Sequence, residues 1–127
     1  MANPLQNKIV YIGVPKRLFD SDLLDTAYRY IFTQTQDIVD PRGMFASNEQ
    51  WLKAFPDYLM TCDAMVIVTD NGYVGRGVYL EWQHFKDTKR PIFLFNERAT
   101  KVYQLREVKS LTISDERDWT YYAIVHY

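Results

Sequence analysis

The chain has almost no cysteine, no long apolar run and no block of like charge. Its single cysteine, Cys62, excludes an intrachain disulfide and a cysteine metal cluster. No stretch of about 18 apolar residues occurs, so no membrane-spanning helix is expected. Residues 1–8 also lack the apolar region of a signal peptide. These absences predict a cytoplasmic protein without membrane attachment.

The charges nearly cancel, with 15 basic and 16 acidic residues and a net charge of -1. Because no basic patch is visible along the sequence, a nucleic-acid polymer is disfavoured as a partner. Apolar residues make up 47% of the chain and aromatic residues 16%, which is enough for a packed core. With 127 residues and no linker-like segment, one domain over residues 1–127 is expected.

Apolar segments bounded by glycine or proline alternate with segments of helical periodicity. The first kind predicts strands over 8–13, 37–40, 64–69 and 91–95. The second kind predicts helices from residue 20 or 21 to about 35, from 47 to 60, and from about 78 to 88. Since parallel strands require a crossover, the alternation predicts an α/β fold. We expect a single-domain, doubly wound, mostly parallel sheet of the flavodoxin or Rossmann type with flanking helices.

Some local features admit more than one interpretation. Pro56 lies inside the second helix and is expected to kink it or to split it. Residues 72–77 are expected to form a glycine-rich turn. Residues 108–113 alternate like a strand, whereas residues 119–127 fit either an edge strand or an aromatic helix.

Two acidic residues follow the third predicted strand. Asp70 comes directly after it, and Glu81 lies near the start of the next helix. In open α/β sheets ligands bind beyond the carboxyl ends of the strands, so both carboxylates are expected at one crevice. One carboxylate could act as a nucleophile and the other could manage a proton, as in glycosidic-bond cleavage. The alternative for Glu81 is a solvent-exposed helix residue.

The segment between these two acids contains the remaining candidate ligand-binding residues. Glycines allow a close backbone approach to an anion, and an arginine could add a bidentate contact to phosphate. The pattern matches neither a phosphate-binding loop with its Gly-Lys-Ser/Thr ending nor the three-glycine dinucleotide fingerprint. A tight turn that needs glycine is an equal interpretation. The candidates are Asn71, Gly72, Tyr73, Gly75, Arg76 and Gly77.

The first predicted strand contributes Tyr11 and Gly13 to the same crevice, where the Tyr11 hydroxyl could bind a carboxylate or a substrate. Tyr11 could equally be a packing residue. Asp63, at the opposite end of the third strand, is interpreted as structural. His84 and His126 show no metal-ligand spacing with each other or with the cysteine, so no metal site is expected. The thiol is interpreted as a small buried apolar group.

Four motifs in this order resemble the nucleoside 2-deoxyribosyltransferase-like family. Val10-Tyr11-Ile12-Gly13-Val14-Pro15 resembles its V-Y-I-A-G-P strand and loop, and Cys62-Asp63-Ala64-Met65-Val66 resembles its C-D-A-x-V strand. The spacing Gly72-Tyr73-x-x-x-Gly77-x-x-x-Glu81 resembles its glycine turn and helix, and Lys89-Arg90-Pro91-Ile92 resembles its G-K-P-V strand start. The resemblance covers residues 8–95.

The resemblance implies an enzyme that cleaves or transfers the N-glycosidic bond of a nucleoside or its 5′-monophosphate. It implies that Glu81 is the nucleophile, that Tyr11 orients its carboxylate, and that the turn over residues 70–77 holds the sugar or its 5′ substituent. It also implies a homo-oligomer. No metal or organic cofactor is expected.

The sequence departs from the family pattern at three places. Gly75 replaces a serine, Phe55 stands near the position of a base-binding aspartate, and the glycine at 13 is shifted by one position. These departures favour a second hypothesis, a nucleotide-binding or sensing module of the same fold without catalysis. A third is a structural subunit whose aromatic residues 119–127 pack on a partner.

Overall fold

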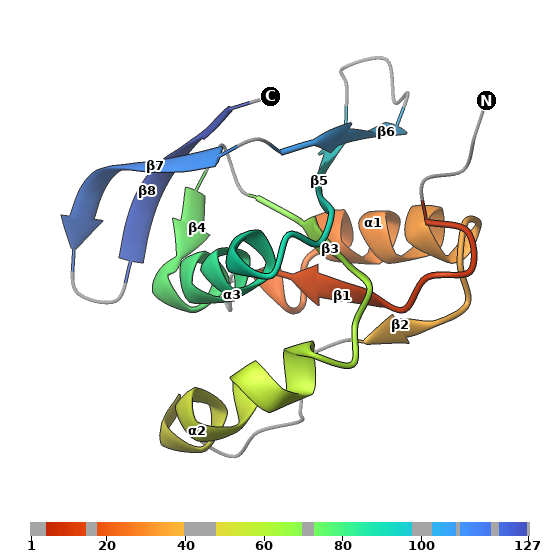
Figure 1. Ribbon diagram of the computed structural model, residues 1–127. Helices are drawn as coiled ribbons and strands as arrows, with labels where there is room; N and C mark the ends of the chain where they lie inside the picture. Colours follow the sequence, from red (N-terminus) through yellow and green to blue (C-terminus); the bar gives the residue numbers. More distant parts are fainter. Residues whose placement is uncertain are drawn as a thin grey trace.

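The computed structural model describes residues 5–14, 18–39, 48–69, 73–97, 103–108, 110–117 and 120–126 (Figure 1). The elements in chain order are β1 (Val10–Gly13), α1 (Asp22–Phe32), β2 (Ile38–Val39), α2 (Asn48–Leu59), β3 (Ala64–Ile67), β4 (Tyr73–Gly75), α3 (Arg76–Asp87), β5 (Ile92–Glu97), β6 (Tyr103–Glu107), β7 (Ser110–Arg117) and β8 (Thr120–His126). Within these ranges strands and helices alternate up to β5, except that β3 and β4 follow each other, and strands alone follow after β5.

The central sheet has the strand order β2-β1-β3-β5-β6. Its first four strands are parallel, with Tyr11 opposite Val39 on one side and Met65 on the other, and β6 is antiparallel to β5. The parallel strands occur in the doubly wound order of flavodoxin-like folds, in which the second strand of the chain lies outside the first. The predicted fold class is therefore confirmed.

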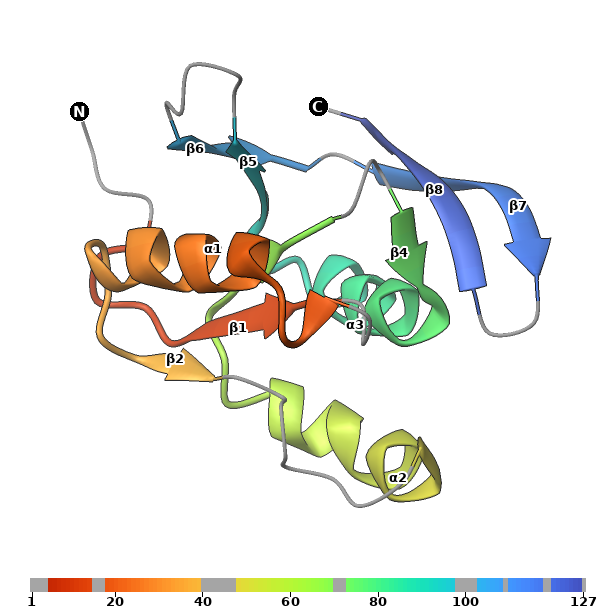
Figure 2. The same ribbon diagram turned by 180° about the vertical axis from the view of Figure 1, so that it is seen from behind.

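Helices cover both faces of this sheet (Figures 1 and 2). Every residue of β1 and β3 is buried, as expected for parallel strands that contact helices on two sides. Because side chains alternate along a strand, Tyr11 and Met65 pack toward α2 and α3. Val10 and Val66 pack toward α1 on the opposite face.

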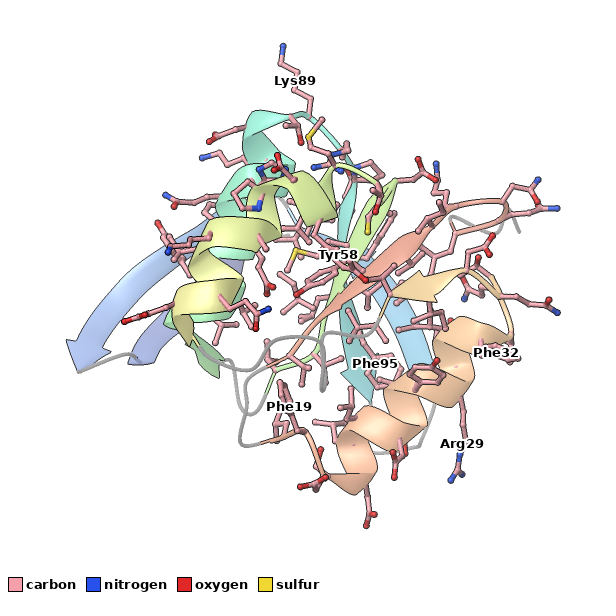
Figure 3. The ribbon with its side chains drawn as sticks, turned by 90° about the horizontal axis from the view of Figure 1, so that it is seen from below. Phe19, Arg29, Phe32, Tyr58, Lys89 and Phe95 are labelled. Atoms are coloured by element: carbon pink, nitrogen blue, oxygen red, sulfur yellow. The ribbon has the colours of Figure 1, made fainter. Side chains whose placement is uncertain are left out.

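Helix α1 begins where Ser21 caps it, since the Ser21 hydroxyl accepts a hydrogen bond from the Leu24 N–H at 3.2 Å. It ends at Phe32, earlier than predicted, where the Thr33 hydroxyl donates to the Tyr30 carbonyl at 2.6 Å. The Tyr30 ring packs against Phe95 of the sheet with centroids 5.7 Å apart. Phe95 is labelled in Figure 3.

Helix α2 runs without interruption from Asn48 to Leu59, with Pro56 inside it. Of the two expected effects of Pro56, a kink or a split into two helices, the split is wrong, because proline removes only one backbone donor and the hydrogen bonding continues beyond it. The Met60 N–H bonds to the Pro56 carbonyl at 3.3 Å, and Leu59 is fully buried. No helix in the described ranges has both the length and the apolar character needed to cross a membrane.

A second, antiparallel sheet has the order β4-β8-β7. The predicted strand over 108–113 is largely found within β7, and β8 resolves the ambiguity of residues 119–127 in favour of a strand. The predicted turn over residues 72–77 is wrong for residues 73–77. Residues 73–75 form β4, because Tyr73 pairs with Tyr122 and Gly75 with Thr120, and residues 76–77 begin α3. Strand β6 was not predicted from the sequence.

Candidate functional site

Helix α3 carries Glu81 on its buried face. Val78, Glu81, Trp82 and Phe85 are all buried, and their spacing is that of one side of an α-helix. Glu81 is only 4% exposed, so the alternative of a solvent-exposed helix residue is wrong. Glu81 is the sixth residue of the helix, so it lies beyond the first turn. The helix dipole acts most strongly within that first turn.

The Glu81 carboxylate is hydrogen-bonded to Tyr11. The Tyr11 hydroxyl, on the central strand β1, donates to Glu81 Oε2 across 70 residues of sequence. Tyr11 is 1% exposed, and its ring stacks on Phe85 with centroids 6.3 Å apart. A buried carboxylate is costly without donors, and this hydroxyl supplies one. The contact joins the two residues that the sequence motifs suggested as a pair.

Gly13 is the last residue of β1 and lies on the same face of the sheet as Tyr11. A Cβ at this position would meet the Met65 ε-methyl group well inside 3.0 Å and Val78 Cγ1 at 3.5 Å. The absence of a side chain at residue 13 therefore makes room for the tip of Met65. This contact was not predicted from the sequence, because it depends on how β1, β3 and α3 pack against one another.

The predicted anion-binding turn is only partly described. Asp70, Asn71 and Gly72 lie outside the described residues. Tyr73 and Gly75 belong to β4, so part of the backbone that was expected to face an anion is paired with β8 instead.

Helix α3 begins directly after β4. Arg76 and Gly77 are its first two residues. Val78, the third residue of the helix, lies beside Gly13 at the carboxyl end of β1. The first N–H groups of a helix favour an anion.

Asp63 has the structural role that the sequence suggested. Its Oδ2 accepts a hydrogen bond from the Ile9 N–H at 2.9 Å, and its own N–H donates to the Ile9 carbonyl at 2.7 Å. These two bonds join the beginnings of β1 and β3. Asp63 is therefore at the end of the sheet away from Gly13.

Arg90, which the motif analysis placed at a strand start, has a structural role that was not predicted from the sequence. Its guanidinium donates to the carbonyls of Leu59, at 2.5 Å, and Cys62, and it lies over the Phe85 ring at 4.2 Å. Burial lowers the pKa of Arg90. Because Phe85 in turn stacks on Tyr11, Arg90 supports the ring that positions the Tyr11 hydroxyl.

Two further titratable residues named from the sequence, Cys62 and His84, have shifted pKa values. Cys62 is buried, as expected, and its burial raises the pKa of the thiol. His84 is on α3, and burial, followed by the charge of Arg90, lowers its pKa. The side chain of His126 is not described. Among the described residues, no group of three or more histidine, cysteine or acidic side chains could hold a metal ion.

The geometry assembled here is a buried tyrosine–glutamate pair between β1 and α3 of a doubly wound sheet. Such a pair can present an oriented carboxylate to a carbon that accepts a nucleophile. Comparison of the chain with protein-family models, with curated proteins and with solved structures finds no match.

Proposed function

We propose that this protein cleaves or transfers the N-glycosidic bond of a nucleoside or nucleoside 5′-monophosphate, with Glu81 as the nucleophile. The single observation that supports this most is the buried hydrogen bond from the Tyr11 hydroxyl to Glu81 Oε2. An oriented carboxylate on the strand-facing side of the helix is what attack on an anomeric carbon requires. The resemblance of four sequence motifs to the nucleoside 2-deoxyribosyltransferase-like family supports the same reaction.

The reaction has two steps. Glu81 attacks C1′ of the sugar, the bond from C1′ to the base nitrogen breaks, and the base leaves with the electron pair and takes up a proton. We assign this proton to Asp70, which lies outside the described residues. Water or a second base then attacks C1′ and loses a proton to the deprotonated Asp70, and the bond from C1′ to the Glu81 oxygen breaks. The configuration at C1′ is therefore retained after two displacements. Tyr11 holds the carboxylate in one orientation throughout.

The decisive experiment measures base release and base exchange on a panel of deoxynucleosides, ribonucleosides and their 5′-monophosphates. The wild-type protein should act on at least one member of the panel. Glu81→Gln removes the nucleophile and should abolish activity, whereas Tyr11→Phe should lower it by about 10²-fold, in the range of a lost positioning contact. Asp87→Asn removes an exposed carboxylate from the same helix and should leave activity unchanged. An inactive wild-type protein, or an active Glu81→Gln variant, would contradict the proposal.

A nucleotide-binding or sensing module is the second candidate. It is favoured by the low exposure of Glu81, 4%, since a sensor does not need its carboxylate to reach a substrate carbon. Calorimetry with the same panel separates the two candidates. A sensor binds a nucleotide that is recovered intact, whereas the enzyme converts it.

We also propose that the protein acts in the cytoplasm as a homo-oligomer. The buried, unpaired thiol of Cys62 supports a reducing compartment. Sedimentation velocity at several protein concentrations tests the oligomeric state, and a monomer at all of them would contradict it.

A further inference from the structure

Two layers of side chains lie between β1 and α3. The layer nearer the carboxyl end of the sheet is apolar and consists of Gly13, the Met65 tip and Val78. The next layer contains Tyr11 and Glu81. Tyr11 is two residues before Gly13, and Glu81 is one helical turn after Val78, so the layers are separated by roughly 6 Å. The apolar layer, here called the covering layer, therefore lies nearer than the polar one to the edge at which ligands enter such sheets.

The Glu81 carboxylate and its surroundings are almost completely shielded from solvent. Glu81 is 4% exposed, Tyr11 is 1% exposed and Met65 is fully buried. A sugar carbon has to come within about 3–3.5 Å of the carboxylate before attack. The arrangement in the structure is therefore a closed one, and some group has to move before a substrate can enter.

Of the groups in the covering layer, the Met65 side chain moves most easily. The backbones of β1 and β3 are each paired on both sides within the sheet. Val78 is β-branched and has few rotamers in a helix. Met65 is unbranched, with three rotatable side-chain bonds, and only its terminal methyl group occupies the space beside Gly13.

The geometry points to Met65 as the gate of the site: its terminal methyl group closes the space beside Gly13 and withdraws to admit a ligand to Glu81. This inference depends on the proposed function only in taking Glu81 as the group that a substrate must reach. Glycine at position 13 leaves the space that the Met65 methyl group occupies, because an added Cβ would displace this flexible tip. The gate also sets the size of the group that fits beside Glu81.

The test uses a reaction of Glu81 that requires no substrate. A water-soluble carbodiimide activates an accessible carboxyl group, and glycine ethyl ester then forms the amide while the carboxyl oxygen leaves in the urea by-product. Peptide mass spectrometry reports the rate at Glu81. We expect slow labelling in the wild-type protein and several-fold faster labelling in Met65→Ala.

Two further variants separate gating from loss of stability. Ile31→Ala removes a fully buried side chain from the opposite face of the sheet, so it lowers stability without opening the site. Met65→Leu conserves core volume but is one bond shorter and branched, so it should fold and still label faster than the wild type.

Equal acceleration in Ile31→Ala, or wild-type rates in both Met65 variants, would overturn the gate. If Glu81→Gln loses base release and the Met65 variants label at the wild-type rate, the proposed function is supported and the gate is contradicted. If the Met65 variants label faster but the wild-type protein releases no base from any substrate, the gate is supported and the proposed function is contradicted.

Discussion

Replacing Tyr11 with phenylalanine tests the contact on which the site is built. The substitution removes one hydroxyl and leaves the ring that stacks on Phe85. Both partners are almost fully buried, so solvent does not screen their interaction. Removing one partner of a buried hydrogen bond costs about 1–3 kcal/mol, and we therefore expect a loss of about 2 kcal/mol in the free energy of unfolding. For a domain of this size the melting temperature should fall by roughly 5–10 °C.

A double-mutant cycle isolates the pair from its surroundings. Glu81→Leu removes the acceptor, and Tyr11→Phe with Glu81→Leu removes both partners and leaves apolar groups of similar size. Each single variant leaves one polar partner in the core, whereas the double variant leaves neither. We expect the double variant to be less destabilised than the sum of the singles, with a coupling energy of about 1.5–3 kcal/mol.

The free energies of unfolding of the wild type and the variants are measured by urea denaturation, and their m-values should be the same. Tyr28→Phe, on the half-exposed side of α1, is the matched control and should change stability by less than about 0.5 kcal/mol. Additive effects of the two single variants, with a coupling energy below about 0.5 kcal/mol, would refute the hydrogen bond as a source of stability.

Three other predictions concern residues around the site. Arg90→Ala should cost about 1–2 kcal/mol in unfolding free energy, because the carbonyls of Leu59 and Cys62 lose a charged donor, and Arg90→Lys should recover less than half of it by urea denaturation. Iodoacetamide should alkylate Cys62 far more slowly in the native than in the unfolded protein at pH 8.5, because burial raises the pKa of the thiol; equal rates would contradict this. Burial lowers the pKa of His84 from 6.5, so the unfolded chain binds more protons near that pH, and stability should decrease as the pH falls from about 7.5 toward the folded-state value. His84→Gln should flatten this part of the pH profile, and an unchanged slope would contradict the assignment.

Local sequence patterns were sufficient for the core of the fold. The apolar residues of β1 and β3 are buried on both faces, and such continuous runs are typical of parallel strands between helices. Ser21 was one of two predicted caps for α1, and it is the residue that caps the helix. Helix ends were predicted less well, because Thr33 competes for a backbone carbonyl near the end of α1.

The second sheet could not be derived in the same way. Residues 73–75 contain one of the glycines of the predicted turn, and they become a strand only because β8 lies beside them. Strand pairing is a nonlocal interaction, so the segment and its partner have to be known together.

For the candidate site, the sequence by itself determined which side chains were available: a glutamate after a glycine-rich segment, a tyrosine in the first strand and a glycine at that strand's end. Only the tertiary structure decided that the Tyr11 hydroxyl reaches Glu81 and that the tip of Met65 fills the space beside Gly13. The physical reason is that local periodicity assigns a residue to a face, whereas the packing of β1, β3 and α3 decides which side chains on those faces meet.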